Sequence, residues 1–306
     1  MSQREQVEFK AMDGVILRGH FYPASSPGKS SAVIMTPGFN TTRDVFLPNI
    51  AHSFQSSGIS CLVYDPRTIG SSDGQPRNNI NPSLQISDYH DALTFLKSDP
   101  RIDPQKIIYW GFSFAGAVAL CAAALDKRAK AVIAINPLTV WDLPANKRAK
   151  VLAKAMQDRE SQVAGNEAFR LPMLTETGEN PAGFGAGGVG VEEVKLVKEA
   201  KEKIVGFEDT TTLQTYYHIV SWNPFEVVRL MGKTSVLLVS AAEDRISPVE
   251  LQKKVYLEAL QREDGGKGGA RDLLVVEGRG HMDILDGKSL VAAMEKQVEF
   301  VRKVIN

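Results

Sequence analysis

The chain has 306 residues, of which 43% are hydrophobic and 24% charged, and its 36 basic and 36 acidic residues give a formal net charge of zero. This balance gives no support for a polyanionic partner, and no basic cluster interleaved with aromatic residues indicates nucleic-acid binding. No stretch approaches the roughly 20 apolar residues that span a bilayer, so we expect no association with a membrane.

The order of elements along the chain predicts an α/β fold. Asp13-Gly14 is a strong turn signal between Val7 to Lys10 and Val15 to Phe21, so the chain should open with an antiparallel pair of strands. Short apolar runs separated by helical segments then follow at Ser31 to Met35, Ser60 to Tyr64, Ile107 to Trp110, Ala131 to Ile135, Ser235 to Ser240 and Leu273 to Glu277. This alternation indicates a mostly parallel, twisted sheet with helices on both faces.

The cysteines and the first residues bear on the cellular compartment. Cys61 and Cys121 fall inside apolar strand and helix patterns, so we expect buried free thiols rather than a disulfide. No spacing of cysteines and histidines indicates a zinc site, and no cofactor is expected. Residues 1–6 are polar and lack the apolar segment of a secretory signal peptide, which predicts a cytoplasmic protein.

Ser113 stands where the strand Ile107 to Trp110 gives way to a helix beginning near Ala117. A nucleophilic serine is typically presented at such a strand-to-helix turn. The residues two before and two after it should be small, because the backbone there approaches itself closely, and they are Gly111 and Ala115. The alternative is a serine that caps the helix, since short patterns of this kind also arise by chance.

Two downstream strands end in polar residues that would complete a catalytic set. Ser235 to Ser240 leads to Glu243 and Asp244, and the strand near residue 275 leads to His281. Catalytic groups collect at the carboxyl ends of strands in open α/β sheets. Glu243 competes with Asp244 for the role of the acid. Asp283 is a weaker candidate because its position favours local hydrogen bonding or a helix cap.

With the order Ser113, Asp244, His281, the chain resembles the α/β-hydrolase superfamily over nearly its whole length. Within it, the stretches Met35 to Asn40, Tyr64 to Gly74 and Ala122 to Arg128 are similar to a fungal group described as polyketide transferases or thiohydrolases. The resemblance favours Asp244 as the acid. It also raises the expectation of acyl chemistry in secondary metabolism, by analogy.

This resemblance implies two backbone donors for an oxyanion. One is the amide of Phe114, the residue after the nucleophile, at the N-terminus of the next helix. The second comes from the loop after the third strand. There Pro37 stands where many members carry histidine, and proline has no N–H, so we predict Phe39 as the donor. The alternative is a plain strand-to-helix turn.

The alternation of strands and helices lapses between Pro137 and Thr234. We predict a largely helical cap domain at 138–233, inserted into a core made of 1–137 and 234–306. The glycine-rich run from Asn180 to Gly190 indicates a lid or linker loop. The predicted pocket-lining residues are Trp141, Tyr216, Tyr217 and Trp222, although packing between cap and core would equally explain them.

The sequence therefore predicts a serine hydrolase or acyltransferase. The expected substrate is a small-molecule ester or thioester of an apolar or polyketide-like acyl group, with a carrier-bound polyketide as one form of it. Two alternatives stay open: a C–C bond hydrolase that uses the same three residues, and a ligand-binding protein without catalysis. The natural substrate, the choice between hydrolysis and transfer, and the oligomeric state, including a homodimer, do not follow from the sequence.

Overall fold

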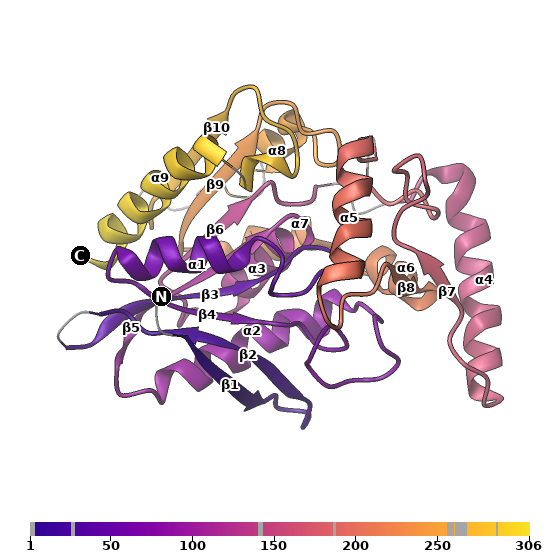
Figure 1. Cartoon of the computed structure of the whole chain (residues 1–306), viewed down its shortest axis with the longest axis horizontal. Coiled ribbons are helices and arrows are strands. Elements are labelled where there is room, and N and C mark those ends of the chain that lie inside the picture. The colour runs from indigo at the N-terminus through magenta and orange to yellow at the C-terminus, as the bar shows by residue number, and fades with distance from the viewer. Residues whose placement is uncertain are drawn as a thin grey trace.

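The structure, a computed structural model, describes residues 4–25, 28–139, 143–185, 188–255, 260, 268–285 and 287–306. Its centre is an eight-stranded sheet (Figure 1) with strand order β1-β2-β4-β3-β5-β6-β9-β10. The strands are β1 (Glu5–Lys10), β2 (Ile16–Tyr22), β3 (Ser30–Thr36), β4 (Ser60–Tyr64), β5 (Ile102–Phe112), β6 (Ala131–Ile135), β9 (Ser235–Ala241) and β10 (Arg271–Val276).

The pairing of the strands agrees with the antiparallel opening and the mostly parallel sheet predicted from the sequence. β1 and β2 form the expected antiparallel hairpin, with Val7 opposite Gly19. β2 is also antiparallel to β4, and every later pair, from β4/β3 to β9/β10, is parallel. The sequence-based prediction of a mostly parallel α/β sheet is confirmed.

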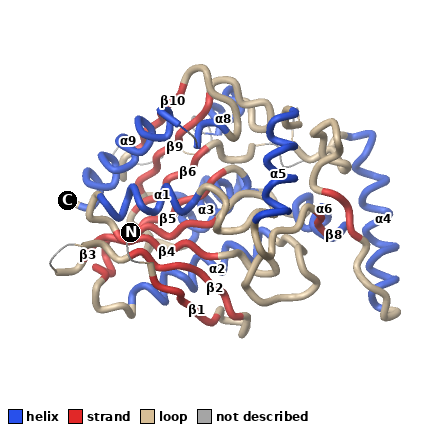
Figure 2. The backbone as a smooth tube through the Cα atoms, viewed as in Figure 1, coloured by secondary structure: helices blue, strands red, loops and turns tan. Residues whose placement is uncertain are grey.

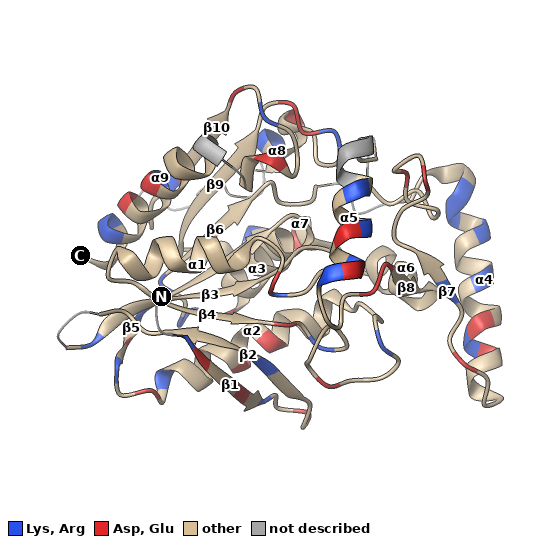
Figure 3. Ribbon diagram, viewed as in Figure 1, with Lys and Arg blue, Asp and Glu red and all other residues tan. Residues whose placement is uncertain are grey.

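Helices cover the sheet on both faces (Figure 2), as its two hydrophobic clusters require. One face carries α2 (Pro82–Lys97) and α3 (Phe114–Leu125), and the other carries α1 (Leu47–Ser56) and α9 (Gly287–Ile305). The strands β3, β4, β6 and β9 contain no charged residue, and charge gathers on outer helices such as α4 and α5 (Figure 3). Such uniformly apolar strands are typical of a parallel sheet buried on both faces.

The segment between β6 and β9 departs from this alternation, as the sequence indicates. Its part from α4 to α6 lies to one side of the sheet (Figure 1). Its elements are α4 (Ala145–Val163), β7 (Arg170–Pro172), α5 (Val191–Lys203), β8 (Thr210–Thr212), α6 (Leu213–Val220), α7 (Pro224–Val228) and the 3₁₀ helix η1 (Arg229–Met231). The antiparallel pair β7/β8 was not predicted. α7 and η1 pack on α3, and the division into core and cap stays a prediction.

The carboxyl ends of three parallel strands lie at one edge of the sheet. α8 (Val249–Lys254) follows β9, and the 3₁₀ helix η3 (Asp283–Leu285) follows β10. Since β5, β9 and β10 run parallel, the residues that follow them meet at the same edge. In the described part of the chain, no helix has both the length and the apolar character needed to cross a membrane.

Candidate active site

Ser113 occupies the turn between β5 and α3 in an uncommon backbone conformation, with φ 56° and ψ −123°. Only strong local contacts hold a residue other than glycine there. Its N–H donates to the Ile135 carbonyl at 2.9 Å, and its own carbonyl accepts from the N–H groups of Gly116 (2.9 Å) and Leu138 (3.0 Å). The Ser113 side chain makes no capping hydrogen bond to α3, so Ser113 does not act as the side-chain cap of that helix.

His281 connects Ser113 to Asp244. The imidazole Nε2 lies 2.7 Å from Ser113 Oγ, and Nδ1 lies 2.8 Å from Asp244 Oδ2. All three residues are buried, with relative exposures of 7% for Ser113, 5% for Asp244 and 6% for His281. A neutral imidazole that donates Nδ1–H to the carboxylate presents the Nε2 lone pair to the serine hydroxyl. The arrangement is therefore that of a nucleophile, a base and an orienting acid.

The geometry separates the three candidate acids. Asp244 Oδ1 accepts the N–H groups of Ile246 (2.9 Å) and Ser247 (2.8 Å), which leaves Oδ2 directed at His281. Glu243 is exposed. Asp283 Oδ1 instead accepts the Gly280 N–H at 2.6 Å, the local role expected from its sequence position. Asp244 is the carboxylate that contacts the histidine.

Asn136 holds the loops that carry Asp244 and His281. It was not identified as a site residue from the sequence. It is fully buried directly after β6, with φ 41°. Its Nδ2 donates to the His281 carbonyl at 3.0 Å, and its Oδ1 accepts from the Ala241 N–H at 2.7 Å. The available signal was a polar residue just past an apolar strand, at the edge that also bears Ser113.

The two residues predicted to supply the oxyanion donors line the same cavity as Ser113. Gly38 brings its loop close to the nucleophile, since a Cβ built on Gly38 would lie 3.5 Å from Ser113 Cβ. Phe39 and Phe114 both line the cavity beside Ser113, and their rings lie 5.7 Å apart. Within the described residues, neither amide donates to another protein group. Both N–H groups are therefore available to a ligand.

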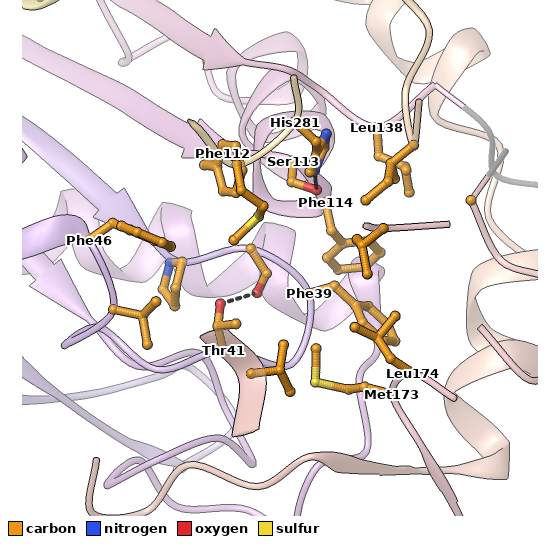
Figure 4. A pocket seen from close by; sticks show the side chains of 18 of the residues that line it. Phe39, Thr41, Phe46, Phe112, Ser113, Phe114, Leu138, Met173, Leu174 and His281 are labelled. Carbon is orange, nitrogen blue, oxygen red and sulfur yellow. Dashed lines mark hydrogen bonds between the residues drawn. The ribbon is translucent and has the colours of Figure 1, made fainter. Parts of the chain in front are cut away.

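Ser113 and His281 open into an apolar cavity (Figure 4) of about 910 Å³ including its opening to solvent. Besides these two residues, its polar side chains among the described residues are those of Thr41 and Asn180, and none is charged. The other lining residues are Pro37, Gly38, Phe39, Val45, Phe46, Leu47, Phe112, Phe114, Leu138, Met173, Leu174, Phe184, Gly185, Val189, Val197, Ile246, Met282 and Leu285. Met173, Leu174 and the residues from 180 to 197 come from the segment between β6 and β9.

The aromatic residues predicted to line the pocket lie elsewhere or outside the described residues. Tyr216 is fully buried and its hydroxyl accepts from Asn180 Nδ2 at 2.9 Å, behind the lining residue Phe184. Trp222 packs behind Phe114, with ring centroids 6.0 Å apart. Tyr217 is half-buried and is not a lining residue either. Trp141 lies outside the described residues. Packing accounts for these contacts, and direct substrate contact stays a prediction.

Two further features concern metals and thiols. In the ranges that the structure describes, His, Cys, Asp and Glu side chains form no group of three that could hold a metal ion. Cys61 and Cys121 are buried and free, as predicted. Burial raises the pKa of the Cys61 thiol well above its usual value, so it is not a reactive thiolate at neutral pH.

Comparison with known proteins gives a consistent result. Residues 31–288 match the model of a family described as alpha/beta hydrolase fold. The chain is 44% identical over 302 residues to a "Thiohydrolase" of Eupenicillium brefeldianum, covering 99% of this chain and 95% of the relative. It is 39% identical over 303 residues to "Polyketide transferase af380" of Aspergillus fumigatus, covering 98% of each.

A solved structure is similar over the same length. It is described as "The structure of DcsB complex with its substrate analogue", and it is 40% identical with a TM-score of 0.89. The match covers 98% of this chain and 99% of that chain. The likeness therefore extends beyond the sheet to the segment between β6 and β9, which contributes residues to the cavity beside Ser113.

Proposed function

The chain belongs to the α/β-hydrolase fold family and is an enzyme of that family; on this premise we propose that Ser113, His281 and Asp244 form its catalytic triad. The observation that carries the proposal is the hydrogen-bonded series Asp244–His281–Ser113, which opens into an apolar cavity. The resulting activity is acyl transfer from an ester or thioester to water or to another acceptor.

The proposed mechanism begins with His281 as general base. His281 Nε2 takes the Ser113 hydroxyl proton while Oγ attacks the acyl carbonyl carbon, and Asp244 stabilises the imidazolium that forms. The carbonyl oxygen becomes an oxyanion, which accepts hydrogen bonds from the amides of Phe39 and Phe114. Collapse breaks the bond to the leaving thiol or alcohol, which receives the proton from His281. An acyl-enzyme remains on Ser113.

The second half of the reaction releases the acyl group. His281 deprotonates water, an alcohol or an amine, which attacks the acyl carbonyl, and the proton returns to Ser113 as the bond to Oγ breaks. Hydrolysis and transfer differ only in this acceptor. We propose that residues 138–233 act as a cap over a core of 1–137 and 234–306. Closure of the cap would exclude water and favour transfer when a second substrate is bound.

The proposed substrate class is an apolar or polyketide-like acyl ester or thioester, with a carrier as one source of the thioester. Two features support it: the uncharged lining of the cavity and the names of the relatives, thiohydrolase and polyketide transferase. An apolar wall favours acyl groups through burial rather than through charge recognition. Among the described lining residues, none has a charged side chain that could form an ion pair beside the acyl chain.

Labelling with a fluorophosphonate tests the central step. We expect a stoichiometric adduct on Ser113 of the wild-type chain and none on the folded Ser113→Ala variant. Parallel assays on p-nitrophenyl octanoate, an octanoyl thioester and a β-diketone identify the bond that is cleaved. Ser113-dependent cleavage of the ester and thioester supports the proposal. Cleavage of the diketone alone would indicate a C–C hydrolase, and no adduct on folded wild-type protein would indicate a non-catalytic binding protein.

An acceptor titration distinguishes transfer from hydrolysis. With the octanoyl thioester as donor, a primary alcohol or amine is added at rising concentration. If transfer operates, the ratio of transfer product to free acid should rise and then saturate, because the acceptor binds beneath the cap. An unchanged ratio at high acceptor concentration would leave simple hydrolysis as the activity.

A further inference from the structure

Asn40 directly follows the proposed oxyanion donor Phe39 and is almost completely buried, with a relative exposure of 2%. It has φ 55°, in the left-handed region that asparagine tolerates better than most residues other than glycine. The carbonyl of Gly38 accepts from the Thr41 N–H at 3.4 Å and from the Thr41 hydroxyl at 3.0 Å, which closes the turn. The backbone bond is long, so the turn alone holds the Phe39 amide weakly.

The Asn40 side chain ties this turn to a distant part of the chain. Its Nδ2 donates to the carbonyls of Glu208 (2.9 Å) and Thr210 (3.1 Å), in and just before β8. Its Oδ1 accepts from Asn78 Nδ2 at 3.0 Å. Both amide protons and the carbonyl oxygen are therefore used, and their partners lie 38 to 170 positions away in the chain. The left-handed turn at Asn40 does not itself require these three long-range hydrogen bonds.

The segment that Asn40 holds also supports the cavity wall. The carbonyl of Asp209, between the two residues that Asn40 contacts, accepts the Met173 N–H at 2.6 Å. Met173 lines the cavity, and its own carbonyl accepts from Asn180 Nδ2 at 3.0 Å. A short path of hydrogen bonds thus joins the wall beside the acyl group to the loop of Phe39.

The ring contacts of Phe39 do not fix its amide in the same way. The ring lies 5.7 Å from that of Phe114 and 5.2 Å from that of Phe184. These contacts orient the side chain, which rotates about χ1 without moving the N–H. The tether through Asn40 acts on the backbone one residue away. It is therefore the contact suited to set the direction of the Phe39 N–H.

We propose that Asn40 is a positioning residue that fixes the Phe39 amide relative to Ser113 and couples it to the cavity wall at 208–210 and Met173. This inference rests on the proposed function, in which the Phe39 amide stabilises the oxyanion. The segment 208–210 then links the cavity wall, which the substrate contacts, to the geometry of the oxyanion site. Loss of Asn40 weakens stabilisation of the transition state more than binding of the substrate.

The variant Asn40→Gly removes the side chain and its three hydrogen bonds while keeping the backbone conformation, because glycine accepts φ 55° without strain. For Ser113-dependent hydrolysis of p-nitrophenyl octanoate, we expect kcat to fall about 10- to 100-fold and KM to change less than about 2-fold. A saturated alkyl boronic acid forms a tetrahedral adduct on serine. Its affinity should fall by a similar factor, whereas binding of octanoic acid should be unchanged.

Thr212→Val is the matched control. It removes the bonds from Thr212 Oγ1 to Asn79 Oδ1 (2.8 Å) and to Thr215 Oγ1 (3.3 Å). The first of these joins the same two regions of the chain without touching the oxyanion loop. We expect a lower melting temperature with unchanged kcat and boronic acid affinity. Asn40→Asp is a second test in case the glycine variant does not fold. Its carboxylate still accepts from Asn78 but cannot donate to the carbonyls of Glu208 and Thr210, so kcat should again fall.

The outcomes separate this inference from the proposed function. If wild-type hydrolysis does not depend on Ser113, both are wrong. If it does, and folded Asn40→Gly or Asn40→Asp protein keeps the wild-type kcat and boronic acid affinity, only the role of Asn40 is wrong. Equal losses of kcat in Asn40→Gly and Thr212→Val would also overturn it, because general loosening of the fold would then explain both.

Discussion

The backbone of Gly111 lies directly against that of Ala115: a Cβ on Gly111 would stand 2.1 Å from the Ala115 carbonyl oxygen and 2.4 Å from its carbonyl carbon. The obstacle is backbone in the first turn of α3, which cannot rotate away as a side chain could. The end of β5 and the start of α3 thus meet on either side of Ser113. This contact explains why the residue two before the serine must be small, as expected from the sequence, and why glycine fits there.

Gly111→Ala should therefore be destabilised by about 3 kcal/mol or more, because overpacking against backbone forces a shift of the turn. Any folded fraction should lose hydrolysis, since the turn carries Ser113. Denaturant unfolding and ester assays measure the two effects. Gly165→Ala is the control: it lies in open space with φ 94°, so only backbone strain of about 1–2 kcal/mol is expected, with normal activity. Equal stability of the two variants would contradict this account.

Asp244→Asn should lower kcat by about 10²- to 10⁴-fold, because an amide no longer stabilises the imidazolium and can favour the wrong tautomer of His281. Steady-state kinetics on p-nitrophenyl octanoate provide the measurement. The neighbouring variant Glu243→Gln should retain wild-type kcat, since Glu243 is exposed and it is the Asp244 carboxylate that contacts His281. The reverse result would identify Glu243 as the functional acid.

The parts of the site that lie at strand ends could be predicted from the sequence. Apolar runs identify β5, β9 and β10, and in a parallel sheet their carboxyl ends must share one edge. Ser113, Asp244 and His281 follow those strands, so their approach could be expected before any coordinates. The position of Asn136 after β6 follows the same rule, but asparagine has no chemistry that singles it out.

The cavity wall could not be predicted, because it depends on packing between segments far apart in the chain. Met173 and Val197 come from irregular or amphipathic stretches whose inward side is set only when they meet the core. The same limit applies to Tyr216 and Trp222. Aromatic composition indicates that such residues will be buried, but not whether they face the cavity or pack behind Phe184 and Phe114.

The uncharged wall predicts discrimination against charged acyl groups. A carboxylate at the far end of the acyl chain would be buried without a charged partner among the described lining residues, which costs several kcal/mol. The kcat/KM for the p-nitrophenyl monoester of octanedioic acid should thus be at least about 100-fold below that for p-nitrophenyl octanoate. Leu174→Arg, which adds a cation to the wall, should narrow this ratio, and Leu174→Met should leave it unchanged. Similar kcat/KM for both esters in wild type would show that the chain end stays in solvent.

Asp126 provides a pH-dependent contribution to the stability of the elements that present Ser113. It ends α3, and its carboxylate accepts from the Tyr109 hydroxyl in β5 (2.9 Å) and from Arg128 (2.7 Å). Burial acts to raise the pKa of Asp126, but the hydrogen bonds from Arg128 and Tyr109 outweigh it, and the pKa lies below its usual value. A carboxyl group whose pKa is lowered in the folded state stabilises the fold at pH values above its unfolded pKa of 3.8. This stabilisation is lost as the pH falls through the folded pKa.

Asp126→Asn should consequently lower the free energy of unfolding by about 1–3 kcal/mol at pH 7, where the charged hydrogen bonds are intact. The difference from wild type should shrink below about pH 4, because the wild-type carboxylate is then being protonated. Urea unfolding at pH 7 and pH 3 measures both values. Glu226→Gln, at an exposed residue 3.8 Å from Arg229, should change the stability by less than about 0.5 kcal/mol at either pH. A deficit in Asp126→Asn that is equally large at pH 3 would mean that lost packing, rather than the charge, accounts for it.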